Sequence, residues 1–425
     1  MALKELVDRL DKAGKLVRIK KPVSVRFEIP SIMRELGGRP VLFENVKESE
    51  YRVVSNIYSS RELLSVGLGI KQDEIIERIA HAIDNPKEPK VEVGKEFREV
   101  ECDLNKLPVM HHYKEDGGPY IASGIVIAND KEYGLNASYH RMMVAGKDRL
   151  VLRILPRHFH EYIKRGNKEI AICIGVSAEV AISAAISCEI NKSELSIANS
   201  MKGMRLYESD GRVFPESDIV LIAEVTGETQ KEGPFLDLTE TFDIVRKQPV
   251  IRVKKILVRE GALFHALLPG GLEHKILMGT PREPTIFREV SKVCDCRDVY
   301  ISPGGCSWLH GIVKIKKKHP DDGKKAIEAA FRGHKSMKHV FVVDEDIDIT
   351  KPEEIEWSMA TRFQGDKDLV VKSNEIGSSL DPSSDPGTRE TCKVGFDLTI
   401  PGRDRESFMK PDLPMKIDIE DYIGD

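Results

Sequence analysis

The chain has 425 residues, of which 40% are hydrophobic and 6% aromatic, and 65 lysines and arginines against 69 aspartates and glutamates give a formal net charge of −4. This length indicates two or three domains, and the near balance of charge argues against a dedicated nucleic-acid binder. The apolar runs are too short to cross a bilayer, and the first 22 residues are too charged for a signal peptide, so we expect a cytoplasmic protein with no membrane contact.

The first hundred residues follow an α/β pattern. Apolar residues at positions 3, 6, 7 and 10 predict an amphipathic helix that stops before Gly14. Strands are predicted near residues 39–46 and 51–57, and helices near 62–70 and 72–84. A Pro-Lys-Glu-Pro-Lys run at 86–90 ends this unit, and residues 102–120 have the composition of a long loop. We therefore expect an N-terminal α/β domain over residues 1–105.

From residue 121 the pattern changes to short strands separated by turn residues, which favours a β-barrel-like domain over residues 106–305. Helical patterns at 158–168, 177–187 and 192–203 interrupt it. After residue 305 strands and helices alternate again, which predicts a C-terminal α/β domain over 306–425. The tail from residue 374 is rich in Ser, Gly, Pro and Asp and is expected to be a loop. The predicted fold class is α+β.

Polar side chains gather on the predicted strand around residue 136. Asn136, Ser138 and His140 would share one face of an extended strand, with Arg141 on the other face unless a bulge intervenes. An amide oxygen, an imidazole and a carboxylate together suit Mg²⁺ or Mn²⁺. Glu224, at the end of the apolar strand "DIVLIAEV", is a candidate for the carboxylate. The alternative is that these are ordinary polar residues of a half-exposed sheet.

The stretch "QKEGPFLDLTE" at 230–240 places Glu232 and Asp237 on either side of Gly233-Pro234-Phe235-Leu236. Gly-Pro excludes a regular helix, so both acids lie on an irregular loop. Either they are ordinary solvated loop residues, or they point into a pocket and handle protons.

These strings, in order along nearly the whole chain, resemble the UbiD family of decarboxylases: "LFENV", "LPVMHHYKEDGGPYIASGIVIAN", "NASYHRMMVAGK", "LPRHFHEY", "SDIVLIAEV", "EGPFLDLTE", "SPGGCSW", "HVFVVDEDIDI" and "IEWSMATR". The resemblance implies an N-terminal α/β domain, a central split β-barrel that binds prenylated FMN, and a C-terminal α/β domain used in dimer assembly. It also implies a divalent metal, Mn²⁺ or Mg²⁺, at the flavin phosphate, with K⁺ nearby.

The resemblance assigns the metal ligands to Asn136, His158 and a glutamate, with His160 a competitor of His158. Family members usually carry the glutamate at the position of Ile222 here; Glu224, two residues later on the same strand face, is the expected substitute. The resemblance also implies a set of residues that contact the flavin: Asn136, Ser138, Tyr139, His140, Arg141, Arg157, His158 and Lys393. The family's phosphate-binding lysine is replaced, and Lys393 or Arg403 is expected to serve instead.

The catalytic trio implied by the resemblance is Arg141, Glu232 and Asp237. Arg141 would bind the substrate carboxylate through a charged, two-pronged contact, and Glu232 would fix its plane. Asp237 would be the general acid, which requires that burial and a neighbouring carboxylate keep it protonated. The flavin would provide the electron sink that no side chain can supply.

The expected activity is non-oxidative decarboxylation of an α,β-unsaturated acid. The chain resembles the compact archaeal branch of the family, which implies trans-anhydromevalonate 5-phosphate as substrate and isopentenyl phosphate as product. Candidate cations for the substrate phosphate are His140, Lys275 and Arg282, and the loop 378–390 is a candidate lid. A polyprenyl-4-hydroxybenzoate type of acid is the alternative substrate, and a split-barrel FMN oxidoreductase is the alternative of another class. The expected partners are a flavin prenyltransferase as cofactor supplier and further copies of the chain in a homodimer or larger homo-oligomer.

Overall fold

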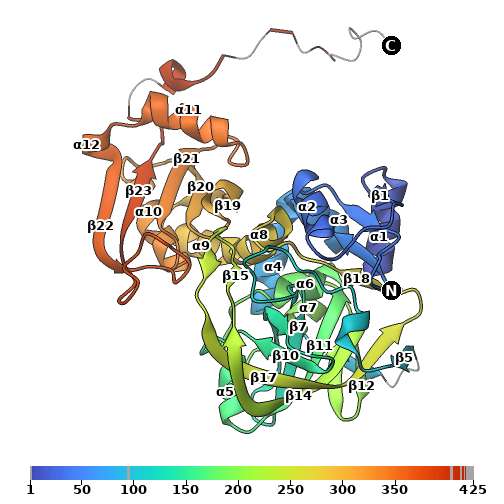
Figure 1. Ribbon diagram of the computed structural model, residues 1–425. Helices are drawn as coiled ribbons and strands as arrows, with labels where there is room; N and C mark the ends of the chain where they lie inside the picture. Colours follow the sequence, from blue (N-terminus) through green and yellow to red (C-terminus); the bar gives the residue numbers. More distant parts are fainter. Residues whose placement is uncertain (1, 93–95, 403–404, 412–413, 416, 418–425) are drawn as a thin grey trace.

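The computed structural model describes residues 2–92, 96–402, 405–411, 414–415 and 417. Figure 1 shows an N-terminal α/β part, a central β-rich part below it, and a C-terminal α/β part to one side. This mixed architecture confirms the predicted fold class. None of the helices in the described residues is long and apolar enough to cross a membrane.

The N-terminal part is a four-stranded sheet with helices packed against it. The sheet has the order β1-β2-β3-β18, where β1 spans Val17–Ile19, β2 Val41–Phe43, β3 Arg52–Ser55 and β18 Leu263–His265. The helices are α1 (Ala2–Lys12), α2 (Glu28–Glu35), α3 (Arg61–Leu68) and α4 (Ile75–Asp84), and the predicted pattern missed α2. Strand β18 was predicted as part of the barrel, but it pairs in parallel with β3. The chain therefore returns to its first domain before it enters the last.

Local sequence explains where these helices begin and end. Helix α1 ends two residues before Gly14, which has a left-handed φ of 67°. Ser60 caps α3, since its side chain accepts a hydrogen bond from the backbone N–H of Leu63, and Gly69 ends that helix with φ 71°. The apolar faces of α1, α3 and α4 join one core with residues of the central sheet, so the first two parts are packed as one unit.

The central part is built on a nine-stranded sheet in which every pairing is antiparallel. Its order is β6-β9-β10-β17-β14-β11-β7-β8, with β5 also paired to β17. The strands span β5 Phe97–Val100, β6 Tyr120–Ile121, β7 Ile125–Asp130, β8 Gly134–Tyr139, β9 Met142–Val144, β10 Arg149–Leu152, β11 Glu169–Val176, β14 Ser217–Glu232 and β17 Arg246–Arg259. A small sheet of β4 (Lys90–Glu92), β12 (Arg205–Ser209) and β13 (Arg212–Pro215) lies beside it, and the helices are α5 (His158–Lys164), α6 (Ala178–Ser183) and α7 (Glu194–Met201).

The long hairpin of β14 and β17 carries the chain from the core to the edge of the molecule. Residues 217–223 of β14 are all buried, and register shifts follow at Ile222/Ala223 and Val225/Thr229. The pairing ends at Glu232 opposite Arg246. Between these two residues a small hairpin of β15 (Phe235–Leu236) and β16 (Phe242–Asp243) projects toward the C-terminal part (Figure 1).

The C-terminal part is a five-stranded sheet of order β19-β20-β21-β23-β22, connected to the rest through α8 (Leu272–Gly279) and α9 (Glu283–Ser291). Its strands are β19 (Asp295–Ile301), β20 (His310–Lys316), β21 (His339–Asp344), β22 (Leu369–Ile376) and β23 (Glu390–Asp397), and its helices are α10 (Asp322–Gly333), α11 (Pro352–Arg362) and α12 (Gly365–Asp368). The predicted loop from residue 374 is wrong at 390–397, where β23 forms a buried part of the sheet beside β21. The domain boundaries predicted at 105 and 305 stay predictions.

Candidate active site

A cavity of about 710 Å³ lies between the central part and the C-terminal part. Its walls come from the end of β8, the start of α5, the α6–α7 connection, the β15–β16 hairpin, and the α8–α9 segment. The C-terminal part contributes Trp308, Ser336, Arg389 and the loop 377–380. Seven of the eight residues predicted to contact a flavin line it: Asn136, Ser138, Tyr139, His140, Arg141, Arg157 and His158.

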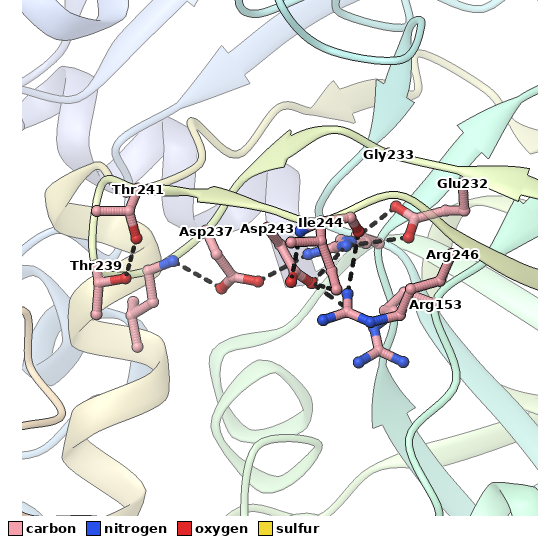
Figure 2. A network of polar contacts seen from close by, with 12 residues as sticks. Arg153, Glu232, Gly233, Asp237, Thr239, Thr241, Asp243, Ile244 and Arg246 are labelled. Carbon is pink, nitrogen blue, oxygen red and sulfur yellow. Dashed lines mark hydrogen bonds and ion pairs between the residues drawn. The ribbon is translucent and has the colours of Figure 1, made fainter. Parts of the chain in front are cut away.

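Arg141 is the centre of a buried cluster of charges, which we call the Arg141 cluster and which comprises Arg141, Glu232, Asp237 and Asp243. The Nε and Nη2 atoms of Arg141 donate to the two carboxylate oxygens of Glu232 at 2.9 and 3.0 Å. Nη1 donates to Asp237 at 2.8 Å, and Nη2 also donates to Asp243 at 2.9 Å. Glu232, Asp237 and Asp243, which are labelled in Figure 2, all form ion pairs with the Arg141 guanidinium, so the structure brings together the whole predicted trio.

Glu232 is held from a second side by Tyr120. The side chain of Glu232 is fully buried, and the Tyr120 hydroxyl donates to its Oε1 at 3.0 Å. The same hydroxyl accepts a hydrogen bond from the backbone N–H of Gly233 at 3.1 Å. One tyrosine thus fixes both the acid and the turn that follows it. Burial and the Glu232 charge raise the pKa of Tyr120 well above its usual range, so this hydroxyl stays protonated.

The turn after Glu232 is packed against the loop that precedes β6. The backbone N–H of Gly117 donates to the Pro234 carbonyl at 2.8 Å, and a Cβ on Gly117 would clash with the Gly233 backbone. Gly233 has φ 95°, a conformation that favours glycine. Phe235 then stacks under the Arg141 guanidinium, 4.8 Å from the ring centre. Glu232, Phe235 and Asp237 therefore reach one cation from a single short segment.

Asp243, Arg153 and Arg246 belong to the site, and the sequence analysis missed them. Asp243 accepts from Arg246 at 2.6 Å and lies 3.8 Å from Arg153 (Figure 2). Burial raises the pKa of Asp243, but hydrogen bonds and charges of Arg246 and Arg141 outweigh it and lower the pKa to about 2. Asp243 lies six residues after Asp237 in the same hairpin. Their proximity depends on the pairing of β15 with β16, which the sequence pattern did not predict.

Asn136 and His158 come together around a carboxylate that was not predicted, Glu194. The Asn136 side-chain amide donates to both Glu194 oxygens at 3.1 and 3.0 Å, and the backbone N–H of Ala137 donates at 2.9 Å. The Nδ1 atom of His158 lies 4.0 Å from Oε1 of Glu194. Burial outweighs these hydrogen bonds and raises the pKa of Glu194 to about 7. A buried carboxylate with no cation beside it is costly, and a bound metal would remove that cost.

The donor set of Asn136, His158 and Glu194 fits a hard divalent cation. It offers amide and carboxylate oxygens with one imidazole, and rotation of the amide exchanges its oxygen and nitrogen, so that Oδ1 can face the ion. In the described residues no group of three or more His, Cys, Asp or Glu has metal-binding geometry, and this site has only two such residues plus the amide. His160 follows on α5 but does not line the cavity.

Glu224 is not part of this group, which corrects the predicted ligand. It lies opposite Glu169 and Arg252 in the sheet and forms an ion pair with Lys254 at 2.6 Å. Residues 222 and 224 are two apart on β14, so the prediction that they share one strand face stands. Ile222, however, is buried in the apolar core and does not line the cavity. Glu194, by contrast, begins α7 directly after its cap Ser193, and a glutamate in the first turn of a helix without any other charged residue was the available clue.

Lys393 does not line the cavity either. It lies in β23, where its ammonium donates to the Lys335 carbonyl at 2.6 Å and sits over the Phe331 ring. The alternative phosphate partner, Arg403, is outside the described residues. Ser138 and His140 are where the strand periodicity put them, joined by a hydrogen bond of 3.0 Å. Arg141 follows the end of β8, so its side chain is free to turn to the same cavity.

Comparison with known proteins assigns the family. The models of the 3-octaprenyl-4-hydroxybenzoate carboxy-lyase N-terminal, Rift-related and C-terminal domains of UbiD match residues 7–83, 85–272 and 275–398. The chain is 42% identical over 417 residues to the anhydromevalonate phosphate decarboxylase of Methanothermobacter thermautotrophicus, covering 94% of this chain and 98% of the relative. It is 39% identical to the protein of that name from Methanocaldococcus jannaschii, covering 97% and 100%.

Solved structures show the same relationship. The UbiD-class enzyme HmfF from Pelotomaculum thermopropionicum in complex with FMN superposes with a TM-score of 0.94 at 32% identity, covering 99% of this chain and all of that chain. An evolved dimeric form of HmfF in complex with prenylated FMN gives a TM-score of 0.90 at 31% identity, again covering 99% and 100%.

Proposed function

The chain belongs to the UbiD family, and we propose that it uses prenylated FMN to convert trans-anhydromevalonate 5-phosphate into isopentenyl phosphate and CO₂. The Arg141 cluster carries this proposal, because it offers a carboxylate-binding guanidinium beside a potential proton donor in one cavity. The identities of 42% and 39% to relatives named anhydromevalonate phosphate decarboxylase support the substrate.

Asn136, His158 and Glu194 would hold Mn²⁺ or Mg²⁺ at the flavin phosphate. The support is chemical: a buried carboxylate without a cation, an imidazole and an amide meet at one wall of the cavity. The family resemblance alone supports a K⁺ ion nearby. A bound prenylated FMN would supply the electron sink for the carbanion that decarboxylation leaves. Its source would be a flavin prenyltransferase.

Arg141 would bind the carboxylate that leaves. Both carboxylate oxygens of Glu232 accept hydrogen bonds from one edge of the guanidinium, Nε and Nη2, and this bidentate contact fixes the plane of the guanidinium. Asp237 accepts from Nη1 and Asp243 accepts from Nη2, each through a single hydrogen bond, and a substrate carboxylate would replace these two contacts. The cluster in this form is the resting state of the clamp, in which acids of the chain stand in for the substrate.

Asp237 would deliver the proton that replaces CO₂. In the resting arrangement it accepts from Arg141 at 2.8 Å and from the backbone N–H of Leu238 at 2.7 Å. When the substrate carboxylate takes over Arg141, Asp237 loses a cation and gains a neighbouring negative charge. Both changes favour the protonated form, as a general acid requires.

The test is turnover by the full chain, produced together with a flavin prenyltransferase. We expect CO₂ and isopentenyl phosphate from trans-anhydromevalonate 5-phosphate, and no turnover of 4-hydroxybenzoate-type acids. The mass and absorbance of the extracted cofactor separate prenylated FMN from FMN. Release of CO₂ only from aromatic acids would overturn the substrate, and substrate oxidation with plain FMN would overturn the reaction class. Homo-oligomer formation is a further proposal, supported by the family resemblance.

A further inference from the structure

Arg282 lines the cavity and has no ion pair with any carboxylate of the described residues. It ends the short 3₁₀ helix Thr280–Arg282 between α8 and α9. Its Nη2 donates to the Ala185 carbonyl at 3.2 Å, and its guanidinium lies over the Trp308 ring at 5.2 Å. Its Nε is buried and has no hydrogen-bond partner among the described residues. This cavity-lining cation therefore has an unused hydrogen-bond donor and no counter-charge within the part of the chain that the structure describes.

Three other largely buried arginines of the described residues, Arg61, Arg141 and Arg362, each have carboxylate partners. Arg61 pairs with Glu283 at 2.7 Å and with Asp298, and Arg362 pairs with Asp346 at 2.5 Å and with Asp344. Arg141 has three carboxylate partners. Burying an unpaired charge is costly, so a protein normally supplies a partner of its own. Arg282 is the exception to that rule on this cavity wall, which indicates that its partner is an anion from outside the chain.

Two more cations without ion pairs in the described residues, Arg157 and Arg389, line the same cavity. Burial, and to a lesser degree the charge of Arg157, lower the pKa of Arg282 to about 10, as expected for a cation with a like charge nearby and no carboxylate partner in the described residues. In and beside the Arg141 cluster the charges balance, because Arg141, Arg153 and Arg246 lie against three acids, Glu232, Asp237 and Asp243. The Arg282 side has an excess of positive charge, as expected for a site that binds a multiply charged anion.

The other two cations that the sequence offered for an anion are already engaged. The ring nitrogens of His140 contact Ser138 and the Arg153 carbonyl, both at 3.0 Å, and burial lowers its pKa to about 4. It is therefore neutral at physiological pH. Lys275 forms an ion pair with Glu240. Of the three candidates, only Arg282 lines the cavity as a cation with no carboxylate partner among the described residues.

We propose that Arg282, together with Arg157, forms a subsite for a phosphate monoester dianion. A planar guanidinium binds phosphate through two parallel hydrogen bonds, and Arg282 has the buried Nε for one of them. This inference rests on the proposed function, which brings two phosphate monoesters into the cavity: that of the flavin and that of the substrate. The shared chemistry defines the subsite, and binding measurements distinguish the source.

The experiment compares phosphorylated ligands with their unphosphorylated counterparts in Arg282→Gln. Calorimetry of the full chain measures FMN and riboflavin; calorimetry of the FMN-loaded chain measures isopentenyl phosphate and isopentenol. Loss of a charge-assisted contact is expected to weaken one phosphorylated ligand about 10- to 100-fold and to leave its counterpart unchanged. Arg282→Lys should keep part of the affinity. Arg288→Gln, which removes an exposed arginine of α9 that pairs with Asp84, is the matched control and should change nothing.

A selective loss of FMN affinity assigns the subsite to the flavin phosphate, and a selective loss of isopentenyl phosphate affinity assigns it to the substrate. Equal affinities in the wild type and Arg282→Gln for both phosphorylated ligands would overturn the proposal. The melting temperature of the ligand-free chain distinguishes anion binding from a merely structural role of Arg282. Arg282→Gln removes an unpaired cation, so this temperature should stay unchanged or rise. A lower melting temperature would contradict the anion-binding role. These readouts need no turnover, so they stand even if the proposed reaction fails.

Discussion

Tyr120→Phe tests whether the hydrogen bonds of Tyr120 to Glu232 and Gly233 hold the Arg141 cluster in its geometry. The substitution removes only the hydroxyl that donates to Glu232 at 3.0 Å and accepts from Gly233 at 3.1 Å. The first bond has a charged acceptor and contributes about 1.5–3 kcal/mol, and the second contributes about 0.5–1.5 kcal/mol. Because Tyr120 is only 1% exposed, water cannot replace either partner. We expect a loss of about 2–4 kcal/mol in stability.

Activity should fall as well, since Glu232 fixes the plane of Arg141. A misplaced guanidinium would lower kcat/KM about 10- to 100-fold, with FMN affinity unchanged because Tyr120 does not line the cavity. Steady-state kinetics, FMN titration and thermal melting measure these three quantities. Tyr58→Phe is the matched control: this buried hydroxyl donates to the Val176 carbonyl at 3.3 Å, away from the cavity, so stability should fall and kcat/KM should not. Wild-type kcat/KM in Tyr120→Phe would refute the positioning role.

Asp237→Asn should keep FMN affinity and lose turnover about 10²- to 10⁴-fold, measured as CO₂ release; full activity would exclude the proton-donor role. Glu194→Gln should weaken metal-dependent FMN binding at least about tenfold, whereas Glu224→Gln, which only loses an ion pair with Lys254, should not; equal effects in a metal titration would contradict the ligand assignment. Burial raises the pKa of Asp116 from 3.8 to about 6, so the folded state holds this proton more tightly and the contribution of this group to stability falls as pH rises from about 4 to about 6. In Asp116→Asn that loss disappears, and the free energy of unfolding relative to the wild type should increase by about 2.4 kcal/mol between pH 4 and pH 7 in denaturant titrations; a constant difference would refute it.

Sequence reasoning identified the parts of the site that share one segment or one motif. Glu232 and Asp237 lie five residues apart on a single turn, and strand periodicity placed Ser138 and His140 on one face. The family resemblance supplied Arg141 as their partner. Apart from α2, the main helices and strands of the first 90 residues followed from apolar periodicity and caps, because these are local effects.

Contacts set by long-range packing were not predictable in the same way. Glu194 is 58 residues from Asn136, and only the packing of α7 beside β8 brings them together. Glu224 looked suitable because a carboxylate ending an apolar strand is unusual, but the β14–β17 register gave it Lys254 as a partner. The prediction for the tail relied on its Ser, Gly and Pro content. That content is typical of the loop 377–389, but it gave no indication of the strand β23 that follows.

A crystal structure of the cofactor-loaded chain with a saturated analogue of the substrate tests the central claim most directly, because that analogue has a carboxylate but no double bond to react. We predict its carboxylate oxygens at hydrogen-bonding distance, about 3 Å, from Nη1 and Nη2 of Arg141, with Asp237 displaced from the guanidinium. A carboxylate bound elsewhere in the cavity, with Arg141 still holding Asp237 and Asp243, would contradict the account.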